Sequence, residues 1–316
     1  MHESMIQAKR IGLEYGFYLL LLAIVAVFTV ISNSFLTVSN FVQIAIASTF
    51  LLAAAAGLTL VLVTGEIDLS IGSTAYVAAT IVYLTADAPA GLSIAAALGA
   101  GLAIGLFNGW IVAYLGMNSL LATLGLMIAY RGVALVITEG TVKQAGEGLA
   151  DLGQLKLFGV IPLIFLTALA ILLVFQWILR KTRLGTYWLA IGNNEDSARK
   201  IGVPVRRAKL AAYALCGISA AASGTLLAGY LGEITTFTGR GMEFQAVAAV
   251  VIGGTSLFGG RGSAFPGTLA GVLLLIIINN GLGTRGVSPF VYPFVAGALI
   301  FFAIYLDAIK NRARSS

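Results

Sequence analysis

Long apolar runs without a charged residue alternate with short polar segments along the chain. The runs of more than 20 residues that lack Asp, Glu, Lys and Arg are 15–65, 88–130, 157–179, 210–232, 262–284 and 286–306. A helix needs about 20 apolar residues to cross the hydrocarbon core of a bilayer, so the two longest runs hold two spans each. The runs lack the strict polar and apolar alternation of membrane barrels. The pattern therefore predicts an all-α integral membrane protein.

We expect about ten transmembrane helices in a compact, glycine-rich bundle that forms one domain over residues 1–316. The predicted segments are about 16–33, 40–64, 70–86, 91–114, 119–138, 158–179, 209–230, 243–258, 264–283 and 289–307. The first segment follows Lys9 and Arg10, and no small-residue cleavage site lies directly behind it. This favours a retained signal anchor over a removed signal peptide.

The composition supports the membrane assignment and excludes several kinds of chemistry. Hydrophobic residues make up 59% of the chain, charged residues 10%, and the mean hydropathy is +0.97. A soluble domain usually has about 25% charged residues. The single cysteine, Cys216, excludes an intrachain disulfide, and the single histidine, His2, lies in the polar N-terminus. We expect no metal site, no catalytic residues and no cofactor in this chain.

The basic residues predict which side of the membrane each connection faces. Thirteen of the nineteen Lys and Arg residues lie in three places: Lys9 and Arg10, the segment 180–209, and the C-terminal residues 310–314. Six predicted spans separate the first group from the second, and four separate the second from the third. Both numbers are even, so the positive-inside rule places both termini and 180–209 in the cytoplasm. The connection of about 139–158, which lacks a basic bias, then faces outward. These positions also make nucleic-acid binding a poor explanation of the pI near 9.5.

Glycines recur at a spacing that suits close helix packing. The chain has 38 glycines, and five of them form small-xxx-small steps: Gly101, Gly105, Gly109, Gly267 and Gly271. Small residues at this spacing let two helix backbones approach each other. We expect these residues to pack helices together.

The segment 65–73, GEIDLSIGS, places two carboxylates between hydrophobic segments. Asp68 or Ser70 could cap the helix that follows, and Gly65 allows the chain to turn. One interpretation is a capped turn on the cytoplasmic side. The other is an interrupted helix whose polar groups line a cavity, the setting in which irregular backbone is tolerated at membrane depth.

Arg131 lies about twelve residues into the fifth segment, which is roughly 18 Å at 1.5 Å per residue. An arginine inside a membrane is costly and usually faces a partner or water. A structural ion pair, snorkelling to the interface and a role in a solute pathway all remain open. Asn108, Asn279 and Asn280 raise the same question more weakly, and a hydrogen bond between helices is the default for each.

The segment 183–204 predicts a short exposed helix. Asn193 or Asn194 can cap it, while the acidic and basic residues that follow suit its positive and negative ends. Gly202 would end it, and Ala198 and Ile201 would be exposed on one side. A solvated basic loop is one interpretation, and a docking helix for a cytoplasmic partner is the other.

The segment 251–263, VIGGTSLFGGRGS, resembles a phosphate-binding loop only superficially. A Walker A motif ends in Gly-Lys-Ser/Thr, with the lysine on the phosphates and the hydroxyl on Mg²⁺. Here Gly260, Arg261 and Gly262 occupy that place, and no other Walker A motif occurs in the chain. Energy from ATP would have to enter through another chain.

At these residues the sequence resembles a known family, the permease subunits of bacterial ABC importers for monosaccharides such as ribose, xylose and galactose. Four segments carry the resemblance: GEIDLSIGS (65–73), TLGLMIAYRG (123–132), RLGTYWLAIGNNEDSARKIGV (183–203) and AVVIGGTSLFGGRGS (249–263). They are spread over most of the chain and follow the order of the family.

The resemblance implies a multi-pass protein of the bacterial inner membrane, surrounded by lipid. Two permease subunits, identical or not, would form one pathway. A cytoplasmic ATPase with two nucleotide-binding halves would hold ATP and Mg²⁺, and an external sugar-binding protein would deliver the solute. The coupling helix that contacts the ATPase would comprise Asn194, Glu195, Asp196, Ala198, Arg199, Ile201 and Gly202.

The resemblance extends to Asp68, Leu69 and Ser70, whereas position 66 varies in type among relatives. Relatives often have an acidic residue at the position of Gln245 and a glycine at the position of Asn193. A sugar needs hydrogen-bonding side chains and an aromatic face. The candidate pathway residues are therefore Asp68, Ser70, Asn108, Arg131, Phe244, Gln245, Phe258 and Asn279.

Two other classes of function compete with an importer subunit. A self-sufficient secondary transporter would need an ion-coupling site, for which Asp68 with Arg131 is the plausible pair. An intramembrane enzyme would need a catalytic dyad, and the predicted bundle contains no histidine to build one.

Overall fold

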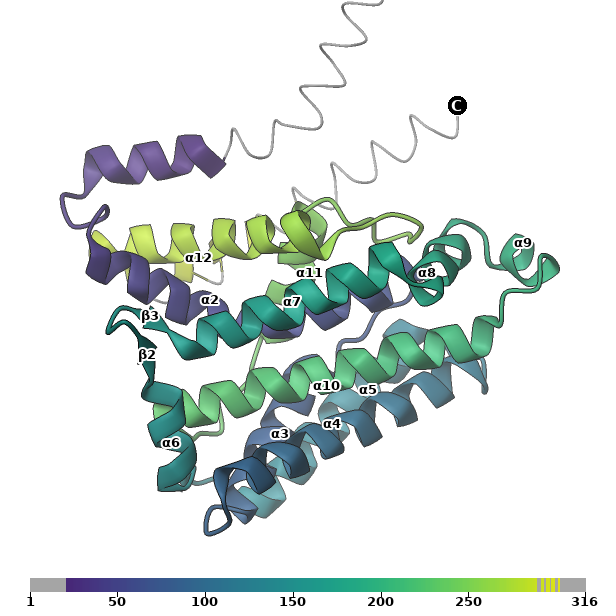
Figure 1. Ribbon diagram of the computed structural model, residues 1–316, viewed down its shortest axis with the longest axis horizontal. Coiled ribbons are helices and arrows are strands. Elements are labelled where there is room, and N and C mark those ends of the chain that lie inside the picture. Colours follow the sequence, from purple (N-terminus) through teal and green to yellow (C-terminus); the bar gives the residue numbers. More distant parts are fainter. Residues whose placement is uncertain (1–20, 289–290, 293, 296, 299–300, 302–316) are drawn as a thin grey trace, which may run out of the picture.

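The computed structural model describes residues 21–288, 291–292, 294–295, 297–298 and 301 of the chain. This part is mostly helical (Figure 1). After a first helix, Leu21–Ile31, the helices are α2 (Val38–Val63), α3 (Ile71–Leu84), α4 (Ala90–Ala113), α5 (Ser119–Thr138), α6 (Glu147–Gln154), α7 (Leu163–Lys181), α8 (Arg183–Asn193), α9 (Glu195–Lys200), α10 (Val205–Leu231), α11 (Met242–Ile252) and α12 (Leu269–Thr284), with a π-helical turn η1 (Ala264–Thr268) before α12.

Helices occur at the predicted hydrophobic segments as far as these are described. Within the part of the chain that the structure describes, six are long and apolar enough to cross a membrane: α2, α4, α5, α7, α10 and the continuous stretch Ala264–Thr284. Leu21–Ile31, α3 and α11 are shorter apolar helices. The predicted segment 289–307 and the basic termini lie mostly or wholly outside the described residues.

The predicted segment 243–258 is too long. Helix α11 ends at Ile252, because Gly253 and Gly254 follow and Gly254 has a φ of +94°. Only glycine adopts this conformation at little cost. The chain then continues as an irregular loop to Ser263.

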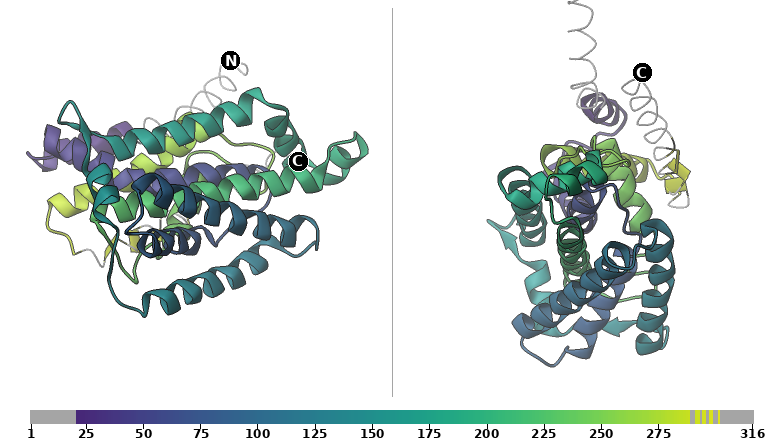
Figure 2. Two further views of the ribbon diagram at one scale, coloured as in Figure 1. Left: turned by 60° about the horizontal axis from the view of Figure 1, so that its bottom comes forward. Right: turned by 90° about the vertical axis from the view of Figure 1, so that its right-hand side faces the viewer.

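Helices α2 and α10 lie at the centre of the bundle. Helix α2 is apolar on all sides and contacts α7, α10, α11 and α12, as expected for a helix that is buried all round. Helix α10 packs on α2, α3 and α4. Few residues of α5 are buried, and the end-on view in Figure 2 shows the outer helices arranged around this centre.

The predicted glycine steps lie where helices approach each other closely. In α4, a Cβ at Gly105 would collide with the Tyr213 carbonyl of α10, and one at Gly109 would lie 2.9 Å from the Tyr213 Cβ. Gly101 contacts Gly217 in the same way. Gly267 and Gly271 lie against the backbone of Gly253 and Ala249, so they let η1 and α12 approach α11.

The two long connections are folded rather than irregular. Residues 139–158 contain β1 (Lys143–Gln144), α6 and β2 (Lys156–Leu157). Strand β1 pairs antiparallel with β4 (Glu233–Ile234), and β2 pairs antiparallel with β3 (Ile161–Pro162). At the opposite end of the bundle, α8 and α9 cover most of residues 180–209, with α9 protruding (Figure 1).

Helix α8 is fixed to the bundle through one buried indole. The Trp188 side chain is fully buried, and its Nε1–H donates to the Ala208 carbonyl of α10 at 2.7 Å. A buried indole usually needs such an acceptor. This bond sets where α9 begins relative to α10.

Candidate functional site

The irregular segment 65–70 between α2 and α3 is held by side chains of neighbouring helices. Gly65 has a φ of +83°, which turns the chain out of α2. The Ile67 N–H donates to Ser119 Oγ at 3.2 Å, and the Leu69 N–H donates to Thr123 Oγ1 at 3.1 Å. The Tyr213 hydroxyl donates to the Ile67 carbonyl at 3.0 Å. Helices α5 and α10 therefore satisfy backbone groups that α2 and α3 cannot.

Asp68 is the centre of a buried polar network. It is 2% exposed, and its Oδ1 accepts from the Ser70 N–H at 2.9 Å and the Ser70 hydroxyl at 2.7 Å. The Asn108 amide of α4 donates to Ser70 Oγ at 2.8 Å and to Asp68 Oδ2 at 3.4 Å. The Tyr130 hydroxyl of α5 donates to Asn108 Oδ1 at 2.7 Å. The network joins α3, α4 and α5.

The structure thus brings together three of the predicted pathway residues, Asp68, Ser70 and Asn108. Ser70 occupies the N-cap position of α3, but the side chain that accepts a backbone N–H there is that of Asp68. All three side chains are closed off from solvent in this conformation. Tyr130 was not among the predicted residues; its one signal in the sequence is a phenol inside an apolar segment.

Arg131 lies next to this network in sequence but points to different partners. Its guanidinium donates at 3.5 Å to the carbonyls of Thr236 and Thr238 and lies 5.6 Å from the centre of the Tyr76 ring. Asp68 and Arg131, the two candidates for an ion-coupling site, therefore have separate partners.

Glu243 is a second buried carboxylate, and it was not among the predicted residues. It lies at the start of α11, and its charge interacts with that of Arg131. A Cβ at Gly72 would collide with the Glu243 carboxylate, so the glycine makes room for it. Within the described part of the chain, Glu243 Oε2 is buried without a hydrogen-bond partner. Only its position next to Phe244 and Gln245 could have indicated it.

The remaining pathway candidates lie apart from the Asp68 network. Phe244 is half-exposed on α11, beside the partly exposed Gln245. Phe258 is exposed in the glycine-rich loop near Gly65. On α12, the amide of Asn280 rather than Asn279 donates to Asn40 of α2, at 2.9 Å.

Replacing Arg131 should show whether its contacts stabilise the fold. We expect Arg131→Ala to lower the melting temperature by a few degrees, because two carbonyls and a ring face lose their cation. Arg131→Lys should lower it less, since an ammonium keeps the charge but cannot bridge two acceptors in a plane. Thermal unfolding in detergent measures both, with the exposed Arg240→Ala as control. Equal, negligible shifts would mean that Arg131 makes no stabilising contact.

Helix α9 forms with the predicted cap. Asn194 Oδ1 accepts from the Ser197 N–H at 2.8 Å, and Gly202 has a φ of +85° just beyond the helix. The predicted exposed pair is half wrong: Ile201 is 78% exposed, but Ala198 is 2% exposed. Ala198 belongs to the main hydrophobic cluster, because this side of α9 lies against the bundle.

A chain of ion pairs runs inward from α9. Glu195 accepts from Arg199 Nη2 at 2.7 Å and from Lys209 Nζ at 2.7 Å, and Lys209 Nζ also lies 2.5 Å from Glu66 Oε1. Partial burial by itself raises the pKa of the Glu195 carboxyl, but the hydrogen bonds and charges of Lys209 and Arg199 outweigh this and place its pKa below the ordinary value. Glu195 is therefore ionised at neutral pH.

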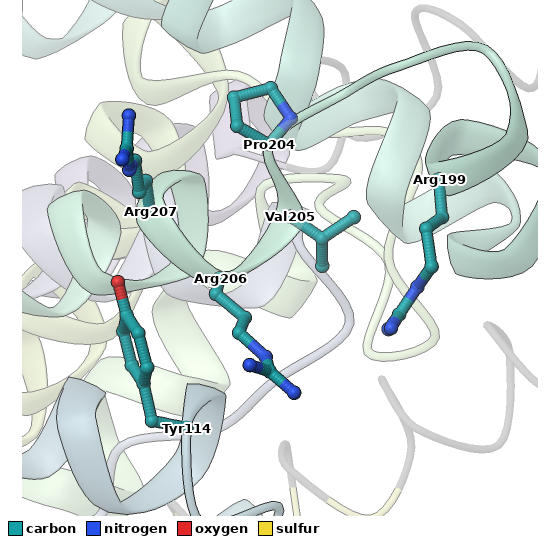
Figure 3. Close-up of a pocket in the computed structure, with 6 residues that line it drawn as sticks. All are labelled: Tyr114, Arg199, Pro204, Val205, Arg206 and Arg207. Carbon is teal, nitrogen blue, oxygen red and sulfur yellow. The ribbon is translucent and has the colours of Figure 1, made fainter.

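Two adjoining cavities open beside these ion pairs. One, of about 540 Å³, is lined by Glu66, Glu195, Lys209 and the connection 113–119 between α4 and α5. The other, of about 340 Å³, is shown in Figure 3. There the side chains of Arg199 and Arg206 extend to the same side, and Arg206 lies 5.8 Å from the centre of the Tyr114 ring. This end of the molecule is polar and strongly basic.

The glycine-rich loop 253–262 serves packing. The Gly260 N–H donates to the Val63 carbonyl at the end of α2 at 2.9 Å, and a Cβ at Gly192 would collide with Gly260. Gly259 and Gly260 have φ values of +81° and +75°. Their conformation and closeness to α2 and α8 explain the glycines without a phosphate.

The apolar helices define a class, the multi-pass membrane proteins, and comparison with known proteins narrows it to a family of transport subunits. The chain belongs to the family described as the permease component of the branched-chain amino acid transport system, whose profile matches residues 40–304.

Two relatives match nearly the whole chain. It is 37% identical over 300 residues to the ribose import permease protein RbsC of Escherichia coli K12, which covers 92% of both chains. It is 35% identical over 295 residues to the autoinducer 2 import system permease protein LsrC of Yersinia pestis, which covers 92% of this chain and 83% of the relative. No solved structure matches the chain.

Proposed function

We propose that this chain is the transmembrane permease subunit of a bacterial ABC importer for a monosaccharide or a related small polar solute. The observation that carries the proposal is the similarity, over 92% of the chain, to permeases that are named for ribose and autoinducer 2 import. An external binding protein would deliver the solute. A cytoplasmic ATPase with two nucleotide-binding halves would hold ATP and Mg²⁺ and drive transport.

The proposed topology has ten spans in one domain in the inner membrane, with both termini in the cytoplasm. The positive-inside rule puts 65–70, 114–119 and 180–209 on one side. These three segments lie at the same end of the bundle, where Glu66, the 113–119 connection and Glu195 line one cavity. The segment 139–158 lies at the other end (Figure 1). This arrangement supports the proposed orientation.

In this proposal α9 is the coupling helix. It protrudes beyond the transmembrane helices; Arg199 is exposed on it, and Ile201 is exposed directly after it. Asn194 caps its first turn and Gly202 ends it. A groove of the ATPase would receive this exposed side, while the buried Ala198 would keep the helix attached to the bundle.

The solute would pass between this chain and a second permease subunit, identical or not. Arg131, Glu243, Phe244 and Gln245 gather charge, amide and aromatic groups where α5 and α11 meet the loop that follows α10. These are the groups that bind sugar hydroxyls and sugar faces. The exposed apolar face of α5 supplies a surface for the second subunit or for lipid.

Isolation from native membranes in a mild detergent tests the proposal. We expect mass spectrometry to find a stoichiometric ATPase with two sets of Walker motifs and an external binding protein. The binding protein should be stabilised in a thermal-shift assay by D-ribose or by another sugar of a small panel. Recovery of the chain alone, with solute flux that follows an ion gradient rather than ATP, would contradict the proposal and favour a secondary transporter.

A further inference from the structure

Lys209 connects two parts of the molecule that the sequence does not relate. It lies in the first turns of α10, and its side chain is only 9% exposed. On one side its ammonium contacts Glu195 of α9, at 2.7 Å, and on the other it contacts Glu66 in the segment before α3, at 2.5 Å. One ammonium therefore joins the proposed coupling helix to the irregular segment 65–70.

The ion pairs around Lys209 oppose separation of α9 from the segment 65–70. Arg199 holds Glu195 from the solvent side at 2.7 Å, which leaves the second carboxylate oxygen directed at Lys209. A mostly buried ammonium that loses one of its carboxylates is left poorly compensated in a medium of low dielectric. A displacement of α9 is therefore expected to draw Lys209 and Glu66 with it.

Glu66 leads directly into the buried network. Two residues further on, Asp68 accepts from the Ser70 hydroxyl, and Ser70 accepts from Asn108 of α4. The neighbouring Ile67 is held by Ser119 of α5 and Tyr213 of α10. A movement of Glu66 thus reaches the ends of α3, α4 and α5. The cavity of about 540 Å³ beside Glu66 and Lys209 leaves space for it.

We propose that Lys209 is a positioning residue that transmits movement of α9 to the segment 65–70 through Glu195 and Glu66. The inference rests on the proposed function, since it needs an ATPase that displaces α9. It goes beyond that function by naming the side chains that carry the displacement into the membrane-spanning bundle. In this chain Glu66 supplies the inner carboxylate of the junction.

The test measures a conformational change in the segment itself, in the complex of this chain with its ATPase. Ile67→Cys places a thiol there, and the native Cys216 is fully buried. The probe is a maleimide, with its labelling rate measured with and without ATP and vanadate. We expect nucleotide to change the rate by about fivefold or more in this parent, the lower range of usual coupling between two sites.

Glu66→Gln is the decisive variant, because it removes one charge and leaves α9 with Lys209, Arg199 and Ala198 in place. It should lose most of the nucleotide effect on labelling while the ATPase stays bound and hydrolyses ATP. Lys209→Gln should behave alike, and Lys209→Arg should retain the effect. The matched control is Glu147→Gln, the same change in α6 at the opposite end of the bundle.

The outcomes separate the role of Lys209 from the proposed importer function. Loss of the nucleotide effect on labelling in Glu66→Gln, together with its retention in Glu147→Gln, supports transmission through Lys209. An undiminished effect in Glu66→Gln, or no effect in the parent while the ATPase binds and hydrolyses ATP, overturns it. Failure of any ATPase to bind the parent would instead contradict the proposed function.

Discussion

Leucine in place of Gly105 is expected to prevent the bundle from assembling normally. Even a Cβ at this position would collide with the Tyr213 carbonyl of α10, and the Ala214 Cα would lie 3.0 Å from it. Helix backbones cannot yield as a flexible side chain can, so α4 and α10 must separate. Overpacking a core usually costs about 1–3 kcal/mol of stability. Because the collision is with backbone, we expect the cost of Gly105→Leu to lie at or above the upper end of this range.

The same helix provides a matched control. At Gly99 a Cβ would meet nothing within 4 Å. We therefore expect Gly99→Leu to keep the parent's yield in the membrane and its melting temperature, while Gly105→Leu loses most of the yield and melts several degrees lower. Size-exclusion chromatography and thermal unfolding in detergent measure both. If the two variants behave alike, close contact between α4 and α10 does not hold the bundle together.

The positions of the helices could be predicted because membrane insertion imposes a simple rule. Runs without charge must satisfy their backbone internally, so they become helices wherever they are long enough. Helices α2, α4 and α5 begin and end within a few residues of the predicted segments. The predicted segment 243–258 runs past Gly253 and Gly254, whereas the positive φ of Gly254 takes the chain out of the helix.

The partners of the polar residues were far harder to predict. Asp68, Ser70 and Asn108 were candidates because each is polar within an apolar setting, but their contact joins residues 40 positions apart. Lys209 was counted only as one basic charge among many. Its pairing with Glu66 spans 143 positions and depends on how α10 passes the end of α2. Charge counting along a chain carries no information about such packing.

The buried network should make Asn108 one of the most sensitive polar residues in the chain. Asn108→Leu keeps the number and branching of the side-chain heavy atoms but removes both the amide that donates to Ser70 and the carbonyl oxygen that accepts from Tyr130. A buried polar group left without a partner costs about 1–3 kcal/mol. We expect a melting temperature several degrees below that of the parent, measured by thermal unfolding in detergent.

Tyr130→Phe distinguishes the contribution of the hydrogen bond to stability from that of side-chain packing, because it removes the hydroxyl and keeps the ring. Alone it removes one hydroxyl and should cost only about 0.5–1.5 kcal/mol, the usual net worth of a hydrogen bond. Combined with Asn108→Leu it should add little, because the leucine has already left the Tyr130 hydroxyl without its acceptor, and residues in one network are not additive. If the two losses in the free energy of unfolding were fully additive, the two side chains would act independently. The bond between α4 and α5 would then not contribute to holding Asp68 in place.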